Sequence, residues 1–226
     1  MLDQGSFYLK ISSLLRTGQE RQAEQELLNA YAELRRTSDI EGLKFVTNRL
    51  AQFYAAPSTE DLPKAEEYFL ECEVLSPEAY TLLQTALFQF CVRRDFPKTI
   101  AKVDEIKSRW DVAHSDSYYS ALTLKGEALV ELGNIESAEH VLEEILAMAR
   151  SNPSGLPHGD ELNLLGAAIA QPSLKECSWA ILRLIIPRIR SREYVRRAQS
   201  LLDRHEKPGT SKPKKKLKRN PGTHKM

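Results

Sequence analysis

The feature that most limits how this 226-residue chain can fold is a pair of amphipathic segments between residues 122 and 146. In the first segment, apolar residues recur at helical spacing on one face. Gly133-Asn134 then ends it, because glycine and asparagine suit a left-handed cap. A second apolar stripe follows at once, which predicts a helical hairpin; since one hairpin cannot bury both faces of its stripe, several must stack. The apolar positions are Leu122, Leu129, Leu132, Ala138, Leu142 and Ile145.

This hairpin resembles a tetratricopeptide repeat, a helix–turn–helix unit of about 34 residues. The family has small residues at its eighth and twentieth positions, here Gly126 and Ala138, where two helices approach closely. It has apolar residues at its eleventh and twenty-fourth positions, here Leu129 and Leu142. It often has a proline near its thirty-second position, and here the proline comes slightly later, as Pro153. The resemblance implies an α-solenoid in which the first helix of each hairpin lines a concave groove.

Weaker copies of the same pattern extend over most of the chain. The small position recurs at Ala23, Ala65, Thr99 and Ala138, at spacings of 42, 34 and 39 residues. Only the middle spacing equals that of the family, so the other two include insertions of 8 and 5 residues. A fifth, degenerate hairpin follows around Gly166. The alternative is a helical bundle without repeats, in which the spacing is coincidental.

We therefore predict an all-α protein, a right-handed α-solenoid of about five tetratricopeptide-like hairpins with a C-terminal capping helix. The repeat domain covers residues 1–205, and the capping helix covers 191–205. Residues 206–226 form a disordered basic tail, because its charged segment 212–219 contains one apolar residue and cannot support a core. The hairpins are expected near residues 5–36, 38–76, 78–110, 117–150 and 159–190.

Charge is divided unevenly along the chain, although the totals nearly cancel. There are 32 Lys and Arg against 31 Asp and Glu, a net charge of +1. Residues 183–226 hold 15 basic and 3 acidic residues, a net of +12, so residues 1–182 carry −11. No apolar run approaches the ~20 residues of a membrane span. The first residues also lack the basic start of a secretory signal, so we expect an intracellular, cytoplasmic protein.

The family resemblance also implies which residues line the concave groove. Aromatic groups beside polar groups suit an extended peptide or a helix laid in a groove. The positions with which the family binds chaperone C-termini hold other residues here, so that ligand is not expected. For Tyr54 and Phe88 the alternative is a place in the core between hairpins; Glu127 and Glu131 either meet a basic partner or form a solvated face. The candidates are Tyr8, Ser12, Arg16, Thr47, Tyr54, Gln84, Phe88, Thr123, Glu127 and Glu131, with Asn163 and Gln171 in the fifth hairpin.

The basic C-terminal end is the second candidate site. Three arginines recur every four residues and would share one side of a helix. Flexible cations attract nucleic-acid phosphates without reading sequence, and the lysine run is similar to a nuclear localisation signal. The alternatives are a solubilising tail and a tail that folds back onto the acidic body. The residues are Arg188, Arg192 and Arg196, followed by Lys214, Lys215, Lys216, Lys218 and Arg219.

The sequence contains no familiar catalytic or metal-binding pattern. Its 5 histidines lack metal-ligand spacing, and there is no phosphate-binding glycine loop or nucleophile motif. Cys72, Cys91 and Cys177 are far apart, and we expect free, mostly buried thiols. We therefore predict a non-enzymatic protein-interaction scaffold or adaptor, without a cofactor, that binds a peptide or a helix. The alternative is a nucleic-acid-associated or nuclear-targeted factor that acts through its basic end.

Overall fold

The computed structural model describes residues 2–109, 116–151, 159 and 161–206, and every regular element in these ranges is a helix. The prediction of an all-α protein is therefore confirmed for the described residues. The basic tail from residue 207 onward lies outside them. The α-helices are α1 (Gln4–Arg16), α2 (Glu20–Thr37), α3 (Ile40–Ala55), α4 (Leu62–Leu75), α5 (Ala79–Phe88), α6 (Phe96–Arg109), α7 (Asp116–Glu131), α8 (Ile135–Ser151), α9 (Glu161–Ala168), α10 (Lys175–Ile185) and α11 (Arg192–Glu206).

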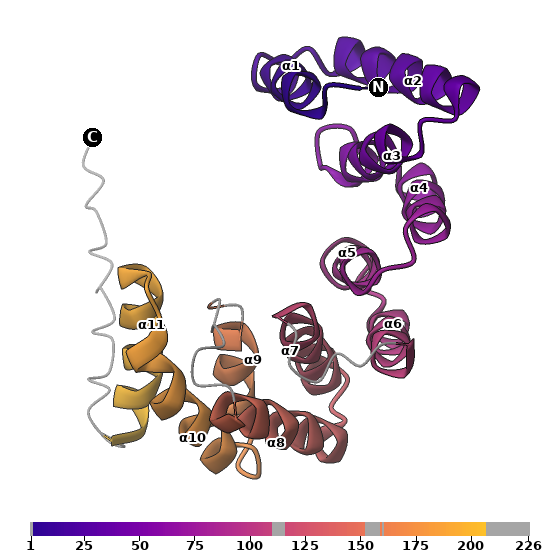
Figure 1. Cartoon of the computed structure of the whole chain (residues 1–226). Coiled ribbons are helices and arrows are strands. Elements are labelled where there is room, and N and C mark those ends of the chain that lie inside the picture. Colours follow the sequence, from indigo (N-terminus) through magenta and orange to yellow (C-terminus); the bar gives the residue numbers. More distant parts are fainter. Residues whose placement is uncertain (1, 110–115, 152–158, 160, 207–226) are drawn as a thin grey trace, which may run out of the picture.

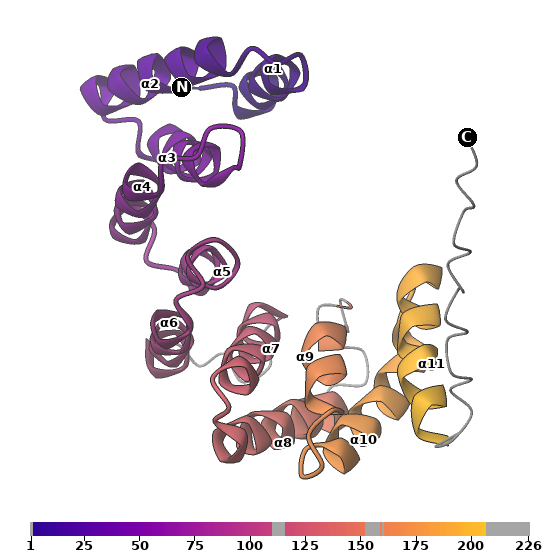
Figure 2. The ribbon, with the colours of Figure 1, turned by 180° about the vertical axis from the view of Figure 1, so that it is seen from behind.

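The helices stack in the order in which they occur in the chain. Each of α1 to α7 packs on the next helix, and α9 packs on α10 and α10 on α11. Alternate helices also meet, since α5 packs on α7, α7 on α9, α9 on α11 and α8 on α10. The result is an open curve with two rows (Figures 1 and 2). We call α1, α3, α5, α7, α9 and α11 the inner row, because they follow the inside of the curve, and the even-numbered helices the outer row.

Local sequence signals explain where several helices begin and end. The carboxylates of Asp3 and Asp39 accept hydrogen bonds from the backbone N–H of Ser6 (3.2 Å) and Gly42 (3.1 Å), which caps the N-termini of α1 and α3. The turn predicted at Gly133-Asn134 separates α7 from α8. Gly133 has φ +71°, a conformation that favours glycine.

The buried apolar residues form two clusters, which both include residues of α5. One cluster joins α1 to α5 and the other joins α5 to α11. Small residues allow the helices to approach closely, since Ala65 and Ala138 are fully buried and a Cβ on Gly126 would lie 2.7 Å from Cδ2 of Leu164. This repeat-like packing positions the inner row. Among the described residues, no helix has the length and apolar character needed to cross a membrane.

Candidate binding surface on the inner row of helices

The predicted groove residues divide into a buried group and a surface group. Thr47, Tyr54, Phe88 and Thr123 are between 0% and 4% exposed, so they do not contribute to a surface in this structure. The surface group remains at least partly exposed, and the polar residue Ser12 is half-buried within it. The surface group comprises Tyr8, Ser12, Arg16, Gln84, Glu127, Glu131, Asn163 and Gln171.

Tyr54 and Phe88 have core roles, in line with the second interpretation of these two residues. The Tyr54 hydroxyl donates a hydrogen bond to Oε1 of Glu24 (2.7 Å), and its ring stacks on Tyr68 with centroids 5.8 Å apart. Burial, followed by the hydrogen bond to Glu24, raises the pKa of Tyr54 above its ordinary value. The Phe88 ring stacks on Phe69 at 4.8 Å. The Tyr54 hydroxyl therefore links α3 to α2, and the Phe88 ring links α5 to α4.

A first cleft, of about 260 Å³, lies between α1, α2 and α3. Its lining brings the predicted residues Tyr8 and Ser12 together with Arg49 and Gln52 of α3. Tyr8 is 44% exposed, so its ring is available to a partner. Leu27 also lines the cleft and is buried in the core. This cleft therefore combines an aromatic ring, a guanidinium and a neutral amide.

Arg49 is held firmly at the edge of this cleft. Its guanidinium lies 4.6 Å from the centroid of the Tyr8 ring and 5.1 Å from that of Phe45. Its Nη1 donates a hydrogen bond to Oε1 of Gln52 (2.9 Å). Its Nε is buried without an acceptor, and no carboxylate of the described residues forms an ion pair with it. Arg49 is thus an ordered cation whose hydrogen-bonding capacity is only partly used.

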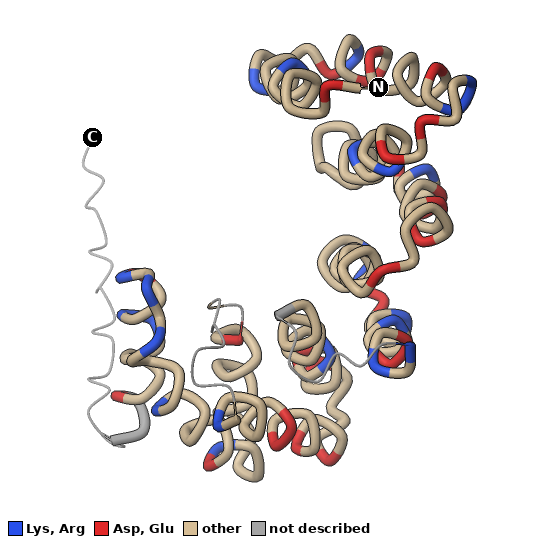
Figure 3. The backbone as a smooth tube through the Cα atoms, in the orientation of Figure 1, with Lys and Arg blue, Asp and Glu red and all other residues tan. Residues whose placement is uncertain are grey.

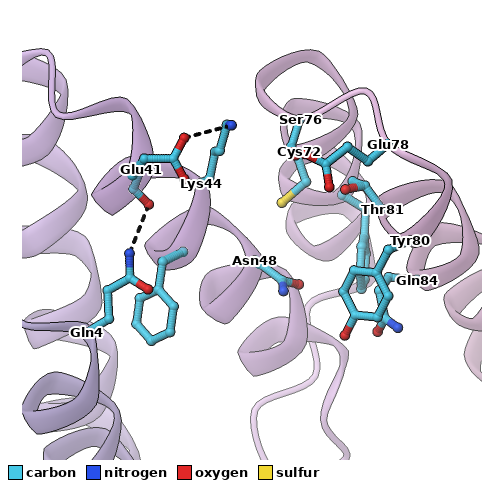
Figure 4. A pocket seen from close by; sticks show the side chains of 12 residues that line it. Gln4, Glu41, Lys44, Asn48, Cys72, Ser76, Glu78, Tyr80, Thr81 and Gln84 are labelled. Carbon is cyan, nitrogen blue, oxygen red and sulfur yellow. Dashed lines mark hydrogen bonds and ion pairs between the residues drawn. The ribbon is translucent and has the colours of Figure 1, made fainter.

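A second cleft, of about 250 Å³, lies between α1, α3, α4 and α5 (Figure 4). Asn48 of α3 faces Tyr80 and Gln84 of α5 across it (Figure 4). Tyr80 is 55% exposed, and the half-buried Phe45 adds a second aromatic ring to the lining. The amides of Asn48 and Gln84 can each donate and accept hydrogen bonds. This lining suits a peptide backbone and an apolar side chain.

The charges around the second cleft are largely compensated within the protein. Lys44 Nζ pairs with Oε1 of Glu41 at 2.9 Å, and the Gln4 amide donates to the Glu41 carbonyl oxygen at 3.4 Å. The ion pair with Glu41 raises the pKa of Lys44, and Glu78 at the cleft adds to this effect. Arg49, on the same face of α3, has no such acidic partner among the described residues.

A third cleft, of about 480 Å³, lies between α7, α9 and α11 and contains the predicted residues Glu127 and Asn163. Arg197 of α11 donates a hydrogen bond to Oδ1 of Asn163 (2.5 Å). Burial raises the pKa of Glu127, and the nearby Glu131 carboxylate raises it further. Glu131 itself pairs with Arg94 at 3.8 Å. These two acids therefore have basic neighbours in the protein, which weakens the argument for a basic partner at this place.

The basic residues predicted near the C-terminus are only partly described. Arg188 donates a hydrogen bond from Nη1 to the Ala149 carbonyl oxygen (2.7 Å), so it helps to join α8 to the end of α10. Arg192 and Arg196 are exposed on α11. The tail residues Lys214, Lys215, Lys216, Lys218 and Arg219 lie outside the described residues.

The two rows of helices differ in charge (Figure 3). Helices α4 and α8 of the outer row each contain four acidic residues and one basic residue, a net charge of −3 each. Helices α1, α3 and α5 of the inner row together contain four basic residues and one acidic residue, a net charge of +3. Helices α4 and α8 are therefore acidic, whereas α6 of the same row has four basic and two acidic residues, a net charge of +2, and the inner surface of the N-terminal half is mildly basic.

Sequence reasoning missed the residues that join the first two clefts, namely Phe45, Asn48, Arg49 and Gln52. Their spacing is itself a signal, because positions i, i+3, i+4 and i+7 share one face of a helix. The 8-residue insertion lies in the turn between α3 and α4, whereas the small position of this hairpin, Ala65, lies in α4. Family positions numbered from Ala65 therefore fall on the core side of α3, as Thr47 does.

The described residues contain no group of histidines, cysteines and carboxylates that could hold a metal ion. Cys72 is buried and Cys177 half-buried, whereas Cys91 is exposed, contrary to its expected burial. Comparison of the chain with protein-family models, with curated proteins and with solved structures finds no match.

Proposed function

We propose that this protein is a non-enzymatic interaction scaffold that holds a peptide or a helix of a partner protein along its inner row. In this proposal the helices form a right-handed solenoid of about five tetratricopeptide-like hairpins, sealed by α11. The observation that carries the proposal is the pair of clefts on one face of α3, which expose aromatic rings beside neutral amides. Such surfaces bind main chain through amides and apolar side chains through rings.

The test starts from peptides selected against the wild-type protein from a random display library. Their affinities are then measured by fluorescence anisotropy for a triple variant, Tyr8→Ala, Tyr80→Ala and Gln84→Ala. The residues are exposed or half-buried, so the variant should fold, and circular dichroism checks this. Tyrosines are enriched among the few interface residues whose truncation costs about 2 kcal/mol or more, so if one of the two is such an anchor, binding should weaken by at least about tenfold.

A matched control removes similar apolar surface from the outer row. Leu70 and Val74 of α4 are 50% and 82% exposed, and the variant Leu70→Ala, Val74→Ala should bind the selected peptides with unchanged affinity. If the inner triple variant binds as tightly as wild type, the peptides do not use the inner row and the proposal is wrong.

Association with nucleic acid is the second candidate, and the exposed arginines Arg192 and Arg196 on α11 favour it. Together with the basic tail they would contact phosphates without sequence specificity. If roughly six to eight duplex phosphates are contacted, log K should fall with log salt with a slope of roughly −5 to −7. A flat salt dependence, or equal binding after truncation at Glu206, would argue against this candidate.

A further inference from the structure

Arg49 is an ordered cation on the inner row without an ion pair among the described residues. Two aromatic rings and the Gln52 amide fix its guanidinium, as described above, so little side-chain freedom remains to be lost on binding. A guanidinium carries five N–H donors in a planar fork that matches a carboxylate. Of these, one bonds to Gln52, and the N–H of the buried Nε is out of a partner's reach, so the remaining N–H groups on the two Nη atoms are the donors available to a carboxylate.

The two lysines of the N-terminal inner helices differ from Arg49 in this respect, since Lys10 pairs with Glu26 at 2.7 Å and Lys44 with Glu41 at 2.9 Å. Arg16, at the end of α1, forms no ion pair with a described residue, but it is exposed and lines neither of the first two clefts. Glu41 is the only acidic residue of helices α1, α3 and α5, and Lys44 pairs with it, whereas Glu78 also lines the second cleft. A partner's carboxylate would therefore avoid like charge at Arg49 but not in the second cleft. Charge complementarity therefore favours an acidic ligand at Arg49.

The position of Arg49 between the two clefts indicates what kind of acidic ligand fits. Arg49 and Gln52 line the first cleft, and Phe45 and Asn48, on the same face of α3, line the second. The Gln52 amide donates to Oδ1 of Asn48 at 3.4 Å, so the two clefts meet at a single turn of the helix. A ligand that fills both clefts must pass over Arg49, which places its acidic group within the chain rather than at the end.

We infer that the inner face of α3 binds an extended segment of a partner protein that carries an internal Asp or Glu side chain. Arg49 takes the carboxylate, the amides of Asn48 and Gln84 take the backbone, and the cleft lined by Phe45 and Tyr80 takes an apolar side chain. The inference rests on the proposed function and adds the chemistry of the partner. Residues 207–226 of this chain do not fit, because they contain eight Lys and Arg and no Asp or Glu.

The experiment uses the full-length protein and pools of random dodecapeptides with one internal position fixed as Asp, Glu, Asn, Gln or Lys. All peptides are acetylated and amidated, so they have no terminal charge. A hydrogen bond between two charged groups is stronger than one to a neutral amide. The acidic pools should therefore bind with an affinity roughly tenfold to a hundredfold higher than the amide pools. The variant Arg49→Gln should abolish this preference, and Arg49→Lys, which retains the stem and the charge, should have an intermediate preference.

The matched control is Arg21→Gln, because Arg21 is an exposed arginine of the outer-row helix α2 without an ion pair in the described residues. It should keep the full preference, and thermal melting checks the fold of every variant. Equal binding of acidic and amide pools, or an acidic preference that survives Arg49→Gln, overturns the inference but leaves peptide binding by the inner row intact. No binding of any pool overturns both. Stronger Arg49-dependent binding of a single-stranded RNA of similar length than of the acidic pools also overturns the inference.

Discussion

Replacing Gly126 with alanine tests the close approach of α7 and α9. A Cβ at this position would lie 2.7 Å from Cδ2 of Leu164 and 3.2 Å from Cγ1 of Val141. Both side chains are buried, so the neighbouring atoms have little room to move. Two effects of opposite sign follow, since alanine favours the helix by about 1 kcal/mol and overpacking of a core costs about 1–3 kcal/mol. We expect the variant to be neutral or destabilised by up to about 2 kcal/mol.

Gly166→Ala is the matched substitution that separates these two effects. Gly166 lies in α9, and a Cβ there would have ordinary contact with Cδ2 of Leu201, at 3.8 Å. It should stabilise the protein by about 0.5–1 kcal/mol, because only the helix preference changes. The difference between the two variants therefore isolates the overpacking, and Gly126→Ala should be less stable than Gly166→Ala by about 1–3 kcal/mol.

The assay is urea unfolding followed by circular dichroism at 222 nm, with the midpoints compared at equal slope. In the background of Leu164→Ala the methyl group of alanine at 126 meets a cavity, so Gly126→Ala should become stabilising there. If Gly126→Ala unfolds at the same urea concentration as Gly166→Ala in the wild-type background, the two helices do not approach as described and the reasoning is refuted.

Two further substitutions test contacts between helices of the outer row. Burial and the hydrogen bond to Glu71 raise the pKa of Tyr31 to about 12. Because the folded state favours the protonated phenol, the wild-type protein should lose stability as the pH rises from about 10 to about 12. The melting temperature of Tyr31→Phe should fall less than that of the wild type across this range. Lys102 joins α6 to α4 through Glu73 at 2.7 Å and also pairs with Glu105 at 3.2 Å. Lys102→Met should lower the free energy of unfolding by roughly 1–3 kcal/mol, because the mostly buried Glu73 carboxylate loses its partner. An unchanged midpoint of urea unfolding would contradict this contact.

Turn residues and apolar periodicity predicted the all-helical class, but not every local feature of the helices. Between α5 and α6 the chain continues into a π-helical turn, Gln89–Arg93, and leaves it at Arg94 with φ 54° before α6 begins at Phe96. No glycine marks this break. The Phe90 ring packs on Phe96 at 5.4 Å, so tertiary packing rather than local preference accompanies the turn.

The candidate site was harder to predict than the fold, because successive residues of a helix point about 100° apart. Thr47 is fully buried, whereas the next residue, Asn48, lines the second cleft. An error of one position in the register therefore exchanges core for surface. Fixed family positions gave Tyr8 and Gln84 correctly as surface residues but missed Arg49, because the inserted turn between α3 and α4 separates the registers of the two helices.

The net charge of residues 1–182 also shows that a sequence total does not give the position of side chains in the fold. A sum of −11 could not reveal that the acidic residues gather on α4 and α8 of the outer row, since the chain changes row with every helix. Because α1, α3 and α5 carry a net charge of +3, we predict that the basic tail does not compete with acidic ligands for the inner surface at Arg49. Deleting residues 207–226 should leave the affinity for acidic peptides unchanged within about twofold at low salt, whereas a tail that occupied the inner surface would make the deletion strengthen binding. An increase of tenfold or more would mean that the tail covers the inner row despite the like charge of α1, α3 and α5.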